Sequence, residues 1–404
     1  MSNSQRSVLF ARLVSDGLQV SDGALAIEGD RITFAGNRDD FNAWDEASNY
    51  TEYPVPEDSL LIPGLIDIHC HGAAGGDFSS PDHDGVTRAV EFLHRSGTTT
   101  VIASLVSSDP TQMLQACEIL AEFAEAGLLA GIHAEGPFLS PERCGAQYPG
   151  YLTDPDPQFV DELVMAARGQ LRTMTFAPEL EETDELIEAL VSHGIVPAVG
   201  HTAATSAQTR QALEQAREEL ESAGVDGFTE RPIVTHLFNA MPPLHHRDPG
   251  PVAAALELAA NDNAILELIA DGVHLADDTV RMVFALVGAK NIALVSDSMA
   301  ATGLADGQYI LGPAAVQVSN GQAMLNNGTT LAGSTATLLQ VLRQTVASGV
   351  PLVRAVVSAT KVPAELIGLA DEAGRLHQGF VADLLVLDPE LELRQVWRNG
   401  QPVD

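Results

Sequence analysis

Lysine and cysteine are scarce in this 404-residue sequence. The three cysteines, Cys70, Cys117 and Cys144, are too few and too scattered for a disulfide framework, which indicates a reducing compartment. Positive charge is also scarce, since 21 Lys and Arg stand against 55 Asp and Glu and give a net charge of −34. Such a chain lacks the basic surface that binds nucleic acids or anionic membranes, so we exclude both as partners.

Long apolar runs are missing as well. No run reaches the about 18 residues needed to span a bilayer, and the first residues lack the apolar core of a signal peptide. With 45% hydrophobic and 19% charged residues, the composition is globular and excludes coiled-coil, collagen-like and disordered classes. We therefore expect a soluble, cytoplasmic protein whose large core needs no disulfides.

Both ends of the chain are rich in short β-strand patterns. Near the amino terminus, three apolar runs are separated by Asp-Gly and Gly-Asp turn signals. Residues 382–403 show a similar pattern that ends in an Asn-Gly hairpin signal. We expect residues 1–58 and 360–404 to form one small β-sandwich module, with a different domain over residues 59–359.

The middle of the chain alternates apolar strand patterns with helical patterns. The eight strand candidates are residues 61–71, 97–105, 129–137, 171–179, 195–202, 233–239, 264–274 and 292–299. Asp109-Pro110 and Gly127 delimit one intervening helix, and Thr183 and Gly194 delimit another. Continuous apolar runs are typical of parallel strands buried on both faces. Eight such strands joined by helices predict an α/β fold, a (β/α)8 TIM-like barrel.

Ionisable side chains recur where these strand candidates end. They are His69 and His71 on the first, Glu135 on the third, His201 on the fifth, His236 on the sixth, His274 on the seventh and Asp297 on the eighth. The carboxyl ends of barrel strands meet at one mouth, where reactive residues gather. The sequence therefore predicts a polar cluster at this mouth.

Imidazole and carboxylate ligands together suit zinc, and also iron, cobalt or manganese. Glu135, His201 and His236 can form a three-ligand site with an open position for water. A second ion could be held by a further group, which comprises His69, His71 and Asp297. A metal lowers the pKa of bound water to roughly 7, and Asp297 is placed to act as the base for that water.

The lysine count bears on how two ions would be bridged. Hydrolases of this architecture often use a carbamylated lysine at the end of the fourth strand, but residues 171–179 contain none. Lys290 and Lys361, the two lysines of the chain, do not end any candidate strand. Glu135 is therefore the remaining candidate bridge.

Six motifs then carry a resemblance that spans the barrel. They are PGLIDIHCHG (63–72), HAEGPF (133–138), GHTAAT (200–205), THLFNAM (235–241), ADGVH (270–274) and VSDSMAATG (295–303). With these motifs the sequence resembles the N-acetylglucosamine-6-phosphate deacetylases of the amidohydrolase superfamily. The resemblance implies metal-dependent removal of acetate from a phosphorylated amino sugar, with one or two divalent ions and Asp297 as the catalytic acid and base.

The same resemblance implies the substrate contacts. By motif position, the sugar phosphate would be contacted by Asn239, Ala240, Arg247 and His274. Arg247 would reach the site of a neighbouring subunit, which implies a homodimer. One position departs from the family pattern, because a Gly-Ala-His loop reads Gly145-Ala146-Gln147 here. Gln147 can donate a hydrogen bond to the acyl carbonyl but cannot become cationic.

Three alternatives stay open at this point. A deacetylase of N-acetylgalactosamine 6-phosphate would use the same apparatus. A nucleobase deaminase of the same superfamily would share the paired histidines and Asp297, although Glu135 argues against it. A non-catalytic relative is a third possibility, but such proteins typically lose metal ligands, and none of the expected ligands is missing.

Overall fold

The barrel expected for the middle of the chain is present. The structure is a computed structural model that describes residues 6–224 and 229–403. Eight parallel strands follow one another in the order of the sequence. They are β6 (Leu65–Cys70), β9 (Thr98–Val106), β10 (Gly131–Glu135), β11 (Leu171–Phe176), β12 (Val196–Val199), β13 (Ile233–Val234), β14 (Ile265–Leu268) and β15 (Ile292–Leu294). Each lies inside or overlaps a predicted strand.

The barrel closes through backbone bonds between the end of β6 and the segment that follows β15. The amide of Asp297 donates to the carbonyl of His69 at 2.9 Å, and the amide of His71 donates to the carbonyl of Ser298 at 2.8 Å. The chain beyond β15 therefore runs beside β6, and the (β/α)8 prediction is confirmed.

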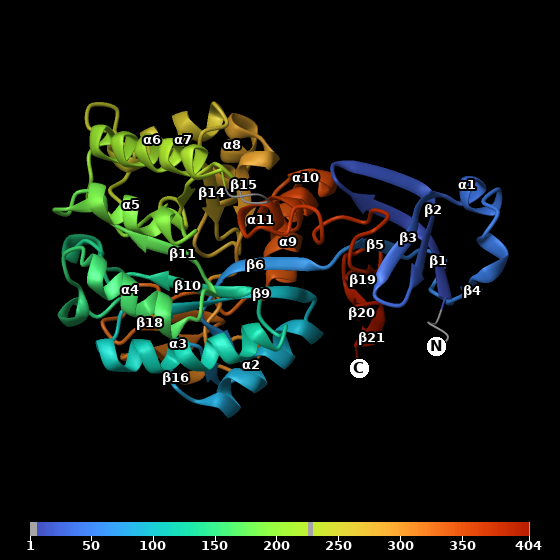
Figure 1. The fold of residues 1–404 in the computed structure, drawn as a ribbon, viewed down its shortest axis with the longest axis horizontal. Helices are drawn as coiled ribbons and strands as arrows, with labels where there is room; N and C mark the ends of the chain where they lie inside the picture. The colour runs from blue at the N-terminus through green and yellow to red at the C-terminus, as the bar shows by residue number, and fades with distance from the viewer. Residues whose placement is uncertain (1–5, 225–228, 404) are drawn as a thin grey trace.

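Helices surround this barrel (Figure 1). They are α2 (His83–Arg95), α3 (Pro110–Glu125), α4 (Pro157–Ala166), α5 (Thr183–Ser192), α6 (Ser206–Ala223), α7 (Gly250–Ala260), α8 (Asp277–Val287), α9 (Leu338–Ala347), α10 (Leu352–Ala359) and α11 (Lys361–Leu366). As predicted, Asp109 caps α3, since its carboxylate accepts from the amides of Thr111 and Gln112. Thr183 differs from expectation, because it is already helical and Glu182 precedes it with a positive φ of 60°. Across the described residues, none of the helices combines the length and apolarity needed to cross a membrane.

The two ends of the chain share one sheet, seen at the side of the barrel in Figure 1. Its strands are β1 (Arg6–Ser15), β2 (Leu18–Glu28), β3 (Arg31–Asn37), β4 (Thr51–Glu52), β5 (Leu60–Pro63), β19 (Leu384–Leu387), β20 (Leu393–Arg398) and β21 (Gln401–Val403). Leu9, Leu25 and Trp397 belong to one buried cluster of this module, and Phe41 belongs to another. The expected β-module from both termini is therefore present.

Both junctions lie one element later than the expected boundaries at residues 59 and 360. β5 pairs with β1 and β19 of the terminal sheet, although it lies within the range 59–359. In turn, α11 packs its Val362 and Leu366 against barrel residues. Gly64 alone separates β5 from β6, and a Cβ there would overlap the side chain of Thr99. Glycine therefore permits the close passage of the chain from module to barrel.

An excursion follows the last barrel strand. It forms a separate three-stranded antiparallel sheet of β16 (Gly307–Leu311), β17 (Ala314–Ser319) and β18 (Gln322–Leu325). Leu311 and the segment 329–331 of this excursion line the same cavity as the strand-end histidines. The excursion thus forms one wall of the barrel mouth.

Candidate active site

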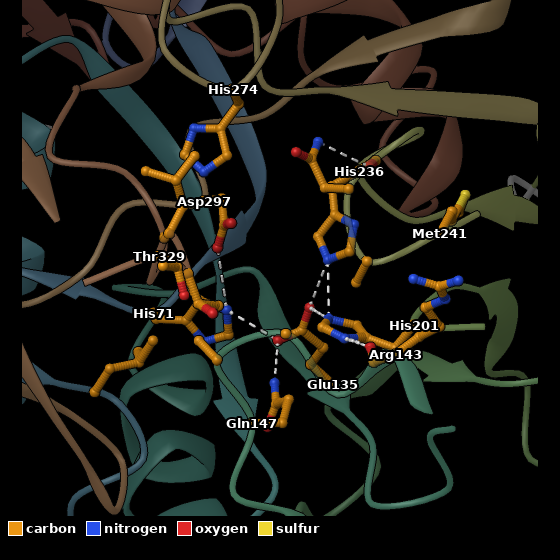
Figure 2. A pocket seen from close by; sticks show the side chains of 18 of the residues that line it. His71, Glu135, Arg143, Gln147, His201, His236, Met241, His274, Asp297 and Thr329 are labelled. Atoms are coloured by element: carbon orange, nitrogen blue, oxygen red, sulfur yellow. Dashed lines mark hydrogen bonds and ion pairs between the residues drawn. The ribbon is translucent and has the colours of Figure 1, made fainter. Parts of the chain in front are cut away.

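A cavity of about 420 Å³ opens at the carboxyl ends of the barrel strands. Figure 2 shows Glu135 near its centre, with His71 on one side and His201 and His236 on the other. The lining also includes Asp297 and the loop that follows β10. The polar cluster predicted at this mouth is therefore assembled in one place.

Three of these residues have left-handed backbone conformations. The φ angles are 46° for His201, 30° for His236 and 47° for Asp297, each just beyond the end of its strand. Such a conformation costs a non-glycine residue on the order of 1–3 kcal/mol and persists only where surrounding contacts enforce it. Strain at the ends of three strands that open into one cavity, each carrying an ionisable group, indicates a functional site.

Glu135, His201 and His236 form the tighter of two potential ligand groups. Oε1 of Glu135 lies 2.9 Å from Nε2 of His201 and 3.0 Å from Nε2 of His236. The two Nε2 atoms are 3.0 Å apart. All three side chains are buried.

His69, His71 and Asp297 form the second group, which adjoins the first. Nε2 of His71 lies 3.3 Å from Oδ1 of Asp297, and the two histidine Nε2 atoms are 3.1 Å apart. Glu135 spans both groups, because its Oε2 lies 3.4 Å from Nε2 of His71. The structure thus brings all six expected ligands together and places Glu135 where a bridge would have to be.

The outer ring nitrogens indicate which atoms face inward. Nδ1 of His201 lies 3.1 Å from the carbonyl of Arg143, and Nδ1 of His71 lies 3.1 Å from the carbonyl of Ser104. A carbonyl can only accept, so each Nδ1 carries the hydrogen and each Nε2 of a neutral ring presents a lone pair to the cavity. Such outer partners commonly orient metal-binding imidazoles.

This arrangement fits a cation. With its hydrogen on Nδ1, neutral His201 directs the lone pair of Nε2 at an oxygen of Glu135 and at the nearby Nε2 of His236. The lone pair of His201 and the oxygen of Glu135 repel each other unless a hydrogen, which Nε2 of His236 can supply, or a metal ion lies between them. Nitrogen and carboxylate donors in two compact, buried groups match the preferences of zinc and related divalent ions.

The pKa values indicate that, without a metal ion, protonated histidines balance the negative charge of the carboxylates. Burial lowers the pKa of His69, but the carboxylates of Glu267 and Glu135 outweigh it and raise the pKa to about 9. Burial likewise opposes protonation of His71, while Asp297 and Glu135 raise its pKa to about 10. Burial raises the pKa of Glu135 itself, yet the surrounding imidazoles hold it well below its usual range. A divalent ion entering this site would therefore displace protons.

Most of the expected substrate contacts also line the cavity. These are Ala146, Gln147, Asn239, Ala240 and His274. Arg247 does not line it, and its side chain is exposed and lies 2.9 Å from Nε2 of His246. Its expected role therefore depends on a neighbouring subunit and stays a prediction.

Gln147 makes a contact that differs from the expected one. Its amide nitrogen donates to Oε2 of Glu135 at 2.5 Å, and its amide oxygen accepts from the backbone of Ser107 at 2.8 Å. The Ser107 amide can only donate, which assigns the orientation of the Gln147 side chain. In this structure Gln147 therefore holds a potential metal ligand, and the expected bond to an acyl carbonyl stays a prediction.

Two further residues of the site were not identified from the sequence. Arg143 lines the cavity, and its Nε has no hydrogen-bond partner among the described residues. Glu267 lies behind the cavity on β14 and contacts Nδ1 of His69 at 2.9 Å. A charged residue inside the apolar run 264–274 is a signal that could have identified Glu267, since lone charges are rarely buried.

Comparisons with known proteins agree with this geometry. The model of the amidohydrolase family matches residues 60–403. The chain is 33% identical to the N-acetylglucosamine-6-phosphate deacetylase of Bacillus subtilis (strain 168), over 85% of this chain and 84% of that protein. It is 31% identical to the N-acetylgalactosamine-6-phosphate deacetylase of Escherichia coli O157:H7, over 85% of this chain and 87% of that protein.

A solved structure is similar over nearly the whole chain. It is that of the N-acetyl-D-glucosamine-6-phosphate deacetylase of Mycobacterium smegmatis, with a TM-score of 0.85, 38% identity, and coverage of 98% of this chain and 100% of that one. The similarity includes the β-module as well as the barrel, because the match extends over both ends of the chain. The chain belongs to the amidohydrolase family.

Proposed function

We propose that this chain removes acetate from N-acetyl-D-glucosamine 6-phosphate in a metal-dependent hydrolysis that yields D-glucosamine 6-phosphate. The observation that carries the proposal is the position of Asp297 in the cavity, directly beside the ligand groups that share Glu135. Several relatives that are 33% to 38% identical to this chain are named N-acetylglucosamine-6-phosphate deacetylase, which supports this substrate. The activity belongs to the use or recycling of amino sugars.

The ligand groups have distinct parts in this reaction. Glu135, His201 and His236 would hold one divalent ion, and the group of His69 and His71 would hold a second. When bound, the ion supplies a lowered pKa for water and polarises the acyl carbonyl. We propose zinc, given the nitrogen and carboxylate donors, with iron, cobalt or manganese as substitutes.

Asp297 moves the proton. Burial raises its pKa, but the hydrogen bond to His71 and the charges of His69 and His71 hold the pKa below its usual value, so the carboxylate is ionised at neutral pH. It takes a proton from the attacking water as oxygen bonds to the acyl carbon. It then delivers that proton to the amide nitrogen as the C–N bond breaks, which releases acetate and the free amine.

Positive charge near the cavity would bind the phosphate. A chain with a net charge of −34 repels an anionic substrate, so local cations are needed. Arg143 faces the cavity, with a guanidinium Nε that has no partner in the described residues. His274 is held by Asp271 through Nδ1 at 2.8 Å, which leaves Nε2 for the sugar. Arg247 would add a second guanidinium from a neighbouring copy in a homodimer.

The cysteines support a cytoplasmic location for this enzyme. Cys70, Cys117 and Cys144 are all free thiols, and the first two are buried. Free thiols without disulfides are typical of a reducing compartment.

The test measures acetate release from N-acetylglucosamine 6-phosphate, from its galactosamine isomer and from unphosphorylated N-acetylglucosamine. The metal content of the protein is measured in parallel. N-Acetylglucosamine 6-phosphate should be hydrolysed much faster than unphosphorylated N-acetylglucosamine. Arg143→Met should raise KM for the phosphorylated sugar only, whereas Arg210→Met, which removes an exposed arginine paired with Glu257, should change nothing. No acetate from either sugar with the metal-loaded protein would refute the proposal.

N-Acetylgalactosamine 6-phosphate is the second candidate substrate. A relative named for that activity is 31% identical to this chain, close to the 33% of the relative named for the glucosamine isomer. The two isomers share the acetamido and phosphate groups and differ at one hydroxyl. The ratio of kcat/KM for the two isomers decides between them.

A further inference from the structure

We propose that Glu267 is a positioning residue that couples the two metal positions, an inference that rests on the metal-dependent function proposed above. One oxygen of its carboxylate contacts a residue of each ligand group. Oε2 of Glu267 lies 2.9 Å from Nδ1 of His69 and 3.2 Å from the backbone amide of His236, which donates to it. The side chain is 4% exposed, so both contacts are made in the barrel interior.

Its place in the fold makes this contact possible. Glu267 lies on β14 (Ile265–Leu268), while His69 lies on β6 and His236 follows β13. The carbonyl of Glu267 also accepts from the amide of Leu237 at 2.9 Å. The seventh strand therefore supports the turn after the sixth strand with both its backbone and its side chain.

Among the outer partners of the histidines in the two ligand groups, Glu267 differs in charge. His71 and His201 each donate Nδ1 to a neutral backbone carbonyl. His69 has a buried carboxylate instead, which strengthens the bond and increases the basicity of the inward Nε2. His69 is thus the histidine whose ring depends most on its outer partner.

His236 depends on the same oxygen in another way. Its Nδ1 is buried without a hydrogen-bond partner among the described residues, so no contact through that atom orients the ring. Its backbone has a positive φ of 30°, a conformation that surrounding contacts must hold. The bond from its amide to Glu267 is such a contact. Loss of this one acceptor should therefore disturb both ligand groups.

Two substitutions of Glu267 distinguish the effect of its hydrogen-bond acceptor from the effect of its negative charge. Glu267→Gln keeps an oxygen that can accept from His69 and His236 but removes the charge, whereas Glu267→Leu removes the acceptor as well. Glu257→Gln, on the exposed face of α7, is a control for the change in net charge. Metal content and affinity are measured by competition with a chelator, using zinc as the probe. In metal-free protein, ¹⁵N NMR of the histidine rings reports the tautomer and proton occupancy of His69.

We expect Glu267→Gln to bind zinc about 10-fold to 100-fold more weakly at one position. Glu267→Leu should lose the ion of His69 and His71, bind the other more weakly, and lose the Nδ1–H signature of His69. Unchanged affinities in both variants, or an unchanged His69 ring in metal-free Glu267→Leu, would overturn the coupling. If Glu267→Leu does not fold, the zinc affinity of Glu267→Gln alone decides whether the coupling exists. Wild-type protein that binds none of zinc, iron, cobalt and manganese would instead refute the proposed function, and the NMR comparison still tests the contacts of Glu267.

Discussion

His69 and His71 at the mouth of the barrel and His94 at its opposite end are all buried, but their pKa values are shifted in opposite directions. At the mouth, His69 and His71 lie among carboxylates that raise their pKa values to about 9 and 10 despite burial. At the opposite end, His94 lies in the last turn of α2, shortly before β9, and is also buried. Its Nε2 has no hydrogen-bond partner in the described part of the chain. Burial and the charge of Arg398 lower its pKa to about 3.

The difference shows that burial alone does not determine charge in this fold. Arg398 of β20 joins the terminal sheet to the barrel by donating to the carbonyls of Thr99 at 3.1 Å and Gly127 at 2.6 Å. A neutral His94 beside Arg398 is compatible with close packing between the terminal sheet and the barrel. The mouth instead concentrates acceptors that need a cation. This division matches the general separation in such barrels between a reactive mouth and a stabilising base.

Metal binding should show the largest effect of this difference. Because the surrounding carboxylates raise the pKa values of His69 and His71 to about 9 and 10, a divalent ion held by these two rings must displace their protons. The apparent affinity at that position should therefore fall by up to about 100-fold for each unit of pH below 9, or by up to about 10⁴-fold from pH 8 to 6. Titration calorimetry in buffers of different ionisation enthalpy measures the proton release. An affinity independent of pH would show that the mouth does not hold these protons.

Asp297→Asn should give the next largest effect, because it removes proton transfer while keeping the shape of the side chain. We expect kcat to fall about 10²-fold to 10⁴-fold. Acetate release gives the rate, and metal analysis verifies that the ion that Glu135, His201 and His236 are proposed to hold is retained. Near-normal turnover with metal bound would exclude Asp297 as the proton carrier.

His94→Leu tests the base of the barrel. His94 is neutral in the folded protein down to about pH 3, but in the unfolded chain it takes up a proton below its ordinary pKa of 6.5. Stability is therefore lost as the pH falls through this window, by about 2–3 kcal/mol at pH 4.5. His94→Leu should remove most of that loss, as measured by urea unfolding at pH 7 and pH 4.5.

A matched control for this measurement is His193→Leu. His193 lies on the surface, 2.8 Å from Asp161 and away from the buried junction, so this variant shows what the loss of a histidine does without removing the buried ring of His94. Equal pH dependence in wild type and His94→Leu would show that the junction does not exclude the proton from His94.

The sequence predicts those features that depend on local patterns and misses those that depend on contacts between distant segments. Strands such as 129–137 were identifiable because parallel strands are apolar on both faces, and Glu135 followed from its place at a carboxyl end. β5 has the same fully buried pattern, so periodicity could not assign it to the terminal sheet. Glu267 was missed because its partners come from strands distant in the sequence. The contact of Gln147 with Glu135 likewise depends on a loop that folds back over the site.

Gln147→Leu should give the smallest effect and the sharpest distinction at the mouth. If Gln147 acts by holding Glu135, its loss should weaken zinc binding about 10-fold and leave kcat of the fully loaded enzyme nearly unchanged. If it acts on the acyl carbonyl, kcat should fall while zinc affinity stays constant. Gln147→His restores a donor that can be charged, so the pH dependence of kcat would change only in the second case. Zinc affinity and kcat, measured on the same preparations, therefore separate a residue that positions the ligand from one that touches the substrate.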